Sequence, residues 1–111
     1  MPGEDKKRAA HQVLVDRVLK GAGKASPEQR ARAFSNADVP PPLQALISKV
    51  ATSPAQVTDA DFAAAKASGL SEDQLFELVV SAAVGQATRM YDAGLAALAE
   101  ATGSGRPDHA T

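Results

Sequence analysis

Five polar residues in this 111-residue sequence are of types that enzymes use for catalysis or ligand binding, and each lies within an apolar helical pattern. They are Arg89, Gln86, Glu77, Tyr91 and His11. A guanidinium can hold a substrate carboxylate through two parallel hydrogen bonds. A histidine, a tyrosine, or a glutamate whose pKa is raised by its surroundings can transfer a proton. The most specific chemistry that these residues offer is therefore acid–base catalysis on a small anionic molecule.

Arg89 lies at the midpoint of a helical pattern that is otherwise apolar, and a guanidinium buried there would need a partner. That partner could be a substrate carboxylate, Asp92 at i+3, Glu77, or a carboxylate across a subunit boundary. Gln86 is one turn earlier on the same face, so it could bond the same partner or cross an interface. For both residues the sequence favours a structural role over ligand binding.

The three acid–base candidates each have a structural alternative. Tyr91 is the only tyrosine and is expected in the core with its hydroxyl at the surface, while Glu77 is expected to be solvated or salt-bridged. His11 falls on the apolar stripe of the first predicted helix, where packing is its expected role. The second histidine, His109, is far along the chain. Metal-ligand spacing is therefore lacking, and we expect neither a metal nor any other cofactor.

The composition excludes thiol chemistry. The chain contains no cysteine, which removes disulfides, thiolate nucleophiles and iron–sulfur clusters. The net charge of −1 argues against nucleic acid as a partner. No apolar run approaches the roughly 18 residues of a membrane span, and we expect a cytoplasmic protein without a membrane partner. Basic residues dominate 1–34 and acidic residues dominate 58–101, which indicates a basic arm docking on an acidic body or on a neighbouring subunit.

The elements that must position these side chains are predicted to be helices only. Proline and glycine divide the chain, and capping boxes open helices at Ser26 and Ser71. Period-two alternation typical of a strand is lacking. We expect one all-α domain over 6–102, with disordered ends at 1–5 and 103–111. Its five helices are predicted at about 6–20, 27–34, 43–50, 58–69 and 72–100.

The last predicted helix is too long for a compact monomer of this size. At 1.5 Å per residue, 72–100 would span about 43 Å, whereas a compact domain of this length measures roughly 34 Å across. Its first half, over 75–87, is apolar on almost every side, and a helix of that kind is buried all round. We therefore predict a homo-oligomer. Gly85, which costs about 1 kcal/mol in a helix interior, indicates close approach of another helix.

The segment VTDADFAAAKASGLSEDQLFELVVSAAVGQATRMYDAGLAAL, residues 57–98, resembles the C-terminal helical region of the carboxymuconolactone decarboxylase family, which has the AhpD-like fold. The shared features are a capped short helix, the turn ASGLSEDQ, and a long helix with ELVVSAA and a mid-helix arginine. The resemblance implies an AhpD-like helical bundle that assembles into dimers, trimers or hexamers.

The resemblance also carries a discrepancy in chemistry. The redox branch of that family uses a Glu-x-x-x-Cys-x-x-Cys-x-x-x-His motif, and this cysteine-less chain offers no position that matches it. Thiol-dependent peroxide or disulfide reduction is excluded. The decarboxylase branch works without a cofactor and remains open. Two hypotheses follow: a cofactor-free enzyme acting on a small carboxylated molecule, or a non-enzymatic, oligomeric helical binding and assembly module.

Overall fold

The computed structural model describes residues 2–102, and over that range the chain is all-α with a long C-terminal helix, as predicted. The helix α1 begins earlier than expected, so that residues 2–5, predicted to be disordered, are helical. Proline suits the first position of a helix, because its missing backbone donor would have no partner there. The predicted tail, with His109, lies outside the described residues. The elements are α1 (Pro2–Lys20), α2 (Pro27–Ser35), α3 (Pro41–Thr52), the short 3-10 turn η1 (Pro54–Gln56), α4 (Asp59–Lys66) and α5 (Glu72–Ala101).

Local signals account for where the helices begin. Both predicted capping boxes are present: the Ser26 hydroxyl accepts from the backbone of Gln29, and Ser71 does the same at the start of α5. Thr58 forms a third capping box at the start of α4. The helix α3 begins within the run of prolines, because prolines in a first turn remove only backbone donors that have no partner there.

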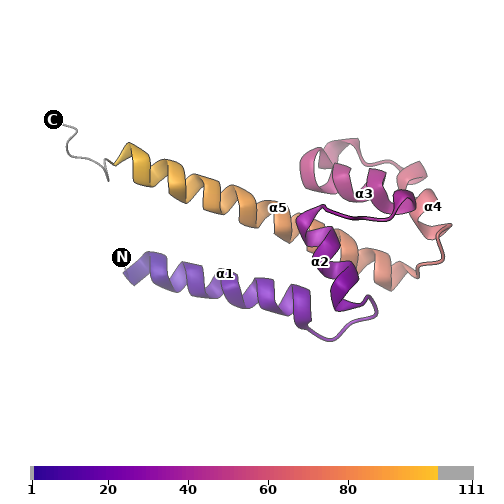
Figure 1. Cartoon of the computed structure of the whole chain (residues 1–111), viewed down its shortest axis with the longest axis horizontal. Helices are drawn as coiled ribbons and strands as arrows, with labels where there is room; N and C mark the ends of the chain where they lie inside the picture. The colour runs from indigo at the N-terminus through magenta and orange to yellow at the C-terminus, as the bar shows by residue number, and fades with distance from the viewer. Residues whose placement is uncertain (1, 103–111) are drawn as a thin grey trace.

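The core is aliphatic and lies where α2 and α3 pack on the first half of α5 (Figure 1). Leu46, Ile47 and Leu78 are among its fully buried side chains, and alanines such as Ala82 fill the closest contacts. Small and branched aliphatic side chains fill this core because the chain has only 4% aromatic residues. The core therefore holds one end of α5 and leaves its other end without a layer of helices around it.

The far half of α5 extends beyond the core, accompanied only by the antiparallel helix α1 (Figure 1). The Cα radius of gyration is 17.3 Å, against about 13 Å for a compact chain of 100 residues. Among the described residues of α5, none after Gly85 is buried. The helices of residues 2–102 do not include one that is long and apolar enough to cross a membrane. This shape agrees with the prediction that α5 is longer than a compact domain of this size.

One side of α5 is left uncovered, which differs from the expectation that 75–87 is buried all round. The neighbouring helices bury the side that carries Leu75, Leu78 and Ala82. On the other side, Phe76 is 70% exposed and Met90 is 64% exposed. Apolar residues recur on this side at alternating spacings of four and three, the pattern that lets one helix pack along another. We call this set the open face: Phe76, Val80, Ala83, Ala87, Met90, Gly94 and Ala97.

Candidate functional site

Arg89 and Gln86 mark where α5 meets α2 of the same chain. The Arg89 Nη1 donates to the carbonyl oxygen of Phe34 at 2.7 Å, and its Nε and Nη2 donate to Gln86 Oε1 at 3.3 and 3.1 Å. Arg89 is exposed rather than buried, and its partners here are a carbonyl and an amide rather than a carboxylate of Asp92 or Glu77. A cation at the end of α2 also complements the dipole of that helix. In this geometry Gln86 orients Arg89, and Arg89 caps the C-terminal end of α2.

Gly85 explains why that carbonyl can come so close. A Cβ built on Gly85 would lie 1.9 Å from the Phe34 carbonyl oxygen and 2.7 Å from its carbon. The predicted close approach of a helix at Gly85 is therefore confirmed, but the helix is α2 of the same chain. Gly85 does not, for this reason, argue for self-association.

Glu77 fastens the loop between α1 and α2. Its two carboxylate oxygens accept from the backbone N–H groups of Lys24 and Ala25, both at 2.8 Å. These two hydrogen bonds are the main cause that lowers the pKa of Glu77, with smaller contributions from the positive charges of Arg30 and Lys24, while burial opposes them. A general base near neutral pH requires the opposite shift. Glu77 is thus built to remain ionised as a structural acceptor.

The lowered pKa of Glu77 makes a pH-dependent contribution to stability. A carboxylate whose pKa is lower in the folded state stabilises the fold above its unfolded pKa, near 4.5, and loses that contribution as the pH falls through the folded pKa. We expect the free energy of unfolding to fall more steeply in the parent than in Glu77→Gln as the pH is lowered below about 5. Denaturant titrations at several pH values measure this difference; parallel pH profiles for the two proteins would contradict it.

His11 and Tyr91 do come together, on the contact between α1 and α5. Their rings stack with centroids 5.2 Å apart, and His11 Nε2 lies 2.8 Å from the Thr88 hydroxyl. That hydroxyl is 2.7 Å from the carbonyl of Val84, which can only accept, so Thr88 donates there and accepts from His11. The Nε2 of His11 therefore carries a hydrogen. This cluster clamps α1 along the far half of α5, as the packing alternative for His11 expected.

Arg30 is a buried cation with a structural role that the sequence did not single out. It is only 6% exposed, and its Nη1 donates to the carbonyls of Gly21 at 2.7 Å and Val18 at 3.2 Å. These are carbonyls at the end of α1, which would otherwise lack partners. The Nε atom is buried without a partner among the described residues. The glycine-rich segment after α1 could have indicated this role. It ends α1 and leaves the last carbonyls of that helix without backbone donors, so that a cationic side chain can donate to them.

An apolar groove beside the first turns of α5 contains none of the predicted site residues. It is an open groove of about 530 Å³ between α4 and α5, which we call the α4–α5 groove. Its floor is apolar, and Lys66 at its rim is paired with Glu72 at 2.9 Å. The groove adjoins the open face, because both include Phe76. Its lining residues are Phe62, Lys66, Glu72, Asp73, Leu75, Phe76 and Val79.

The predicted site residues therefore occupy three structural contacts rather than one catalytic centre. Arg89 with Gln86 joins α5 to α2, Glu77 holds the loop after α1, and His11 with Tyr91 joins α1 to α5. A search for related proteins among family models, characterised proteins and solved structures found no match.

Proposed function

We propose that this chain is a non-enzymatic helical assembly module whose open face binds a second copy of itself. One observation carries the proposal: the side chains suited to chemistry are engaged in contacts within the chain, while an apolar helix face remains exposed. Phe76 and Met90 on that face are more than half exposed. Contiguous exposed apolar patches mark interaction sites in soluble proteins.

A second copy of this chain is a suitable partner for the open face, because its own α5 has the same length and the same spacing of apolar residues. The face follows the alternating four-and-three spacing along more than 20 residues of α5, and a partner with the same repeat can interdigitate along all of it. Two-fold symmetric pairing also brings the same patch from both subunits together. The alanines and Gly94 at the middle and far end of the face allow the two helices to approach closely. Self-association therefore uses the whole of the exposed face.

The alternative hypothesis, an AhpD-like enzyme acting on a small carboxylated molecule, has less support from this geometry. Three guanidinium nitrogens of Arg89 already donate within the chain. Lys66, the cation of the α4–α5 groove, is paired with Glu72. The observation that would favour the enzyme is a cation facing an open cavity with its donors free. The resemblance of 57–98 to the carboxymuconolactone decarboxylase family is compatible with either hypothesis.

A charge at the centre of the open face should dissociate the assembly. Ala87→Glu would place two carboxylates against each other in an apolar contact without partners. We expect the dimer dissociation constant to rise at least about a hundredfold, which corresponds to roughly 3 kcal/mol. Analytical ultracentrifugation over a dilution series measures this change.

Ala96→Glu is the matched control for that substitution. It is also an exposed alanine of α5, but nine positions at 100° each place it on the opposite side of the helix from Ala87. We expect its dissociation constant to equal that of the parent. Equal dissociation by both variants, or by neither, would rule out the open face as the interface.

A further inference from the structure

We propose that the two copies pair antiparallel along α5, so that the far end of one copy seats in the α4–α5 groove of the other. This inference rests on the proposed self-association and adds its orientation, its register and the occupant of the groove. Three independent features of the chain support it: the distribution of charge, the distribution of side-chain size, and the position of the groove beside the open face.

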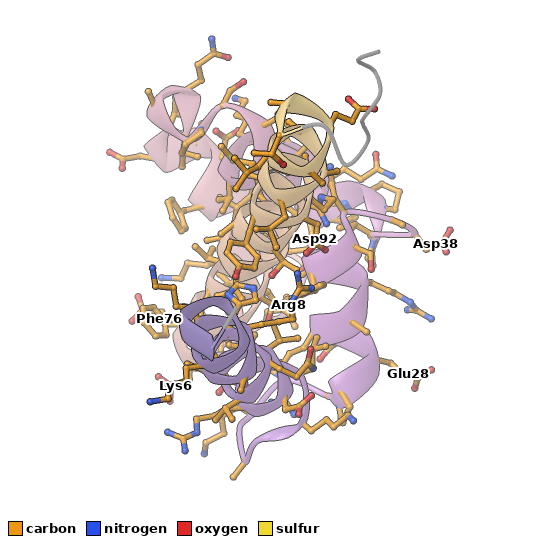
Figure 2. All side chains as sticks on the ribbon, turned by 90° about the vertical axis from the view of Figure 1, so that its left-hand side faces the viewer. Lys6, Arg8, Glu28, Asp38, Phe76 and Asp92 are labelled. Atoms are coloured by element: carbon orange, nitrogen blue, oxygen red, sulfur yellow. The ribbon has the colours of Figure 1, made fainter. Side chains whose placement is uncertain are left out.

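Basic residues of α1 flank one end of the open face, and acidic residues of the α4–α5 groove flank the other. Lys6, on α1, lies beside the far end of α5, and Glu72 and Asp73 line the groove at the other end. In Figure 2, which looks along the molecule from the far end, Lys6 and Phe76 lie on one side, and Glu28 and Asp38 lie on the opposite side. Antiparallel pairing sets each basic end against the partner's acidic end, whereas parallel pairing sets like charges together.

Where side chains are described, the basic residues at the start of α1 form no ion pair with an acidic residue of their own chain. The two ion pairs found among the described residues are Lys49 with Asp61 and Lys66 with Glu72, and neither involves α1. Lys6, Lys7 and Arg8 are exposed. Lys66 neutralises one of the two groove carboxylates and leaves the other, Asp73, for a cation from the partner.

Side-chain sizes along the open face are complementary only when the two helices run in opposite directions. Leu98 borders the open face one turn after Gly94. Ala87 stands midway between Phe76 and Leu98, so an antiparallel crossing centred there sets Phe76 against the partner's Leu98. The same crossing sets Val80 against the partner's Gly94, and Met90 near the partner's Ala83. Parallel pairing would instead set each large residue against its own copy and each small one against another small one, which leaves voids.

The α4–α5 groove receives an apolar side chain in this arrangement. Leu98 is an exposed, large apolar residue of the far end of α5, and antiparallel pairing brings it to the partner's Phe76, which borders the groove. The groove is framed by Phe62 and Val79, which would cover Leu98 on both sides. In a symmetric pair, the exposed Leu98 of each copy is thus buried in the groove at the opposite end of its partner.

The absence of cysteine from the natural sequence permits a direct test of orientation. Phe76→Cys and Ala97→Cys are prepared separately, mixed to allow exchange of subunits, and treated with a short thiol-reactive cross-linker. In an antiparallel pair, position 76 of one copy is beside position 97 of the other, whereas identical positions are about 30 Å apart along the axis. We expect the covalent dimer in the mixture to exceed that from either variant alone by at least tenfold.

The outcomes separate this inference from the function on which it rests. Efficient cross-linking of either variant alone would show parallel pairing and overturn the inference. Dimeric mass for both variants without cross-linking in the mixture would also overturn it, while self-association would stand. Monomeric mass of the parent protein would overturn both. Ala87→Cys, at the expected crossing point, is the control, and it should cross-link to itself.

Discussion

Gly85→Ala is expected to destabilise the protein by about 2 kcal/mol or more, although alanine normally favours a helix by about 1 kcal/mol over glycine. The added methyl would lie 1.9 Å from the carbonyl oxygen of Phe34. That oxygen belongs to the backbone of α2, so the whole helix must move away and weaken the hydrogen bond from Arg89. For a chain of this length, the loss corresponds to roughly 10 °C in melting temperature. Thermal and denaturant unfolding measure the effect.

Gly94→Ala provides the matched control in the same helix. A Cβ at Gly94 has no neighbour within 4 Å in the described chain, so within one copy only the helix propensity changes. Because Gly94 lies on the open face, both glycine substitutions are compared in the Ala87→Glu background, in which the copies are expected to be apart. We expect an unchanged or higher stability, by up to about 1 kcal/mol. If Gly85→Ala proved as stable as Gly94→Ala, the close contact between α2 and α5 would be wrong.

Arg30→Met is expected to cost about 2 kcal/mol. The substitution keeps an unbranched aliphatic stem but leaves the carbonyls of Val18 and Gly21 without their donor. It also removes a positive charge that lowers the pKa of Glu77. The Glu77 carboxylate, which accepts from the backbone of the same loop, is then less stabilised. Because both effects act where α1 ends, hydrogen exchange should increase first over residues 18–25. Unfolding titrations and exchange measurements together test this expectation.

Arg32→Met is the appropriate control, since Arg32 is an exposed arginine of the same helix. Surface substitutions of this kind usually change stability by less than about 0.5 kcal/mol. Equal effects of Arg30→Met and Arg32→Met would contradict the role of Arg30 as the donor that closes α1.

The helices could be predicted because their signals are local. Ser26 and Ser71 open helices through bonds to residues three positions away, and a run of prolines can only start α3, not continue it. The start of α1 was set four residues too late, because a charged, polar segment was interpreted as a disordered end. Gly85 was interpreted correctly as a close contact between helices, but it was taken as support for self-association, whereas the contact is with α2 of the same chain.

The partners of the candidate site residues could not be predicted in the same way. Arg89 bonds the carbonyl of Phe34, which is 55 positions away and carries no side-chain signal in the sequence. Glu77 likewise binds two backbone N–H groups of a distant loop. Such bonds depend on which helix ends meet in space, and any residue type can supply a backbone group. A sequence pattern therefore identifies the polar side chain but not its partner.

The mass of the unmodified protein in solution tests the central claim of self-association most directly. Sedimentation equilibrium at micromolar concentration is expected to give twice the 11.4 kDa of the chain, with dissociation only on dilution. The Ala87→Glu variant should sediment as the single chain at the same concentration. A mass of 11.4 kDa for the parent protein at micromolar concentration would contradict the account.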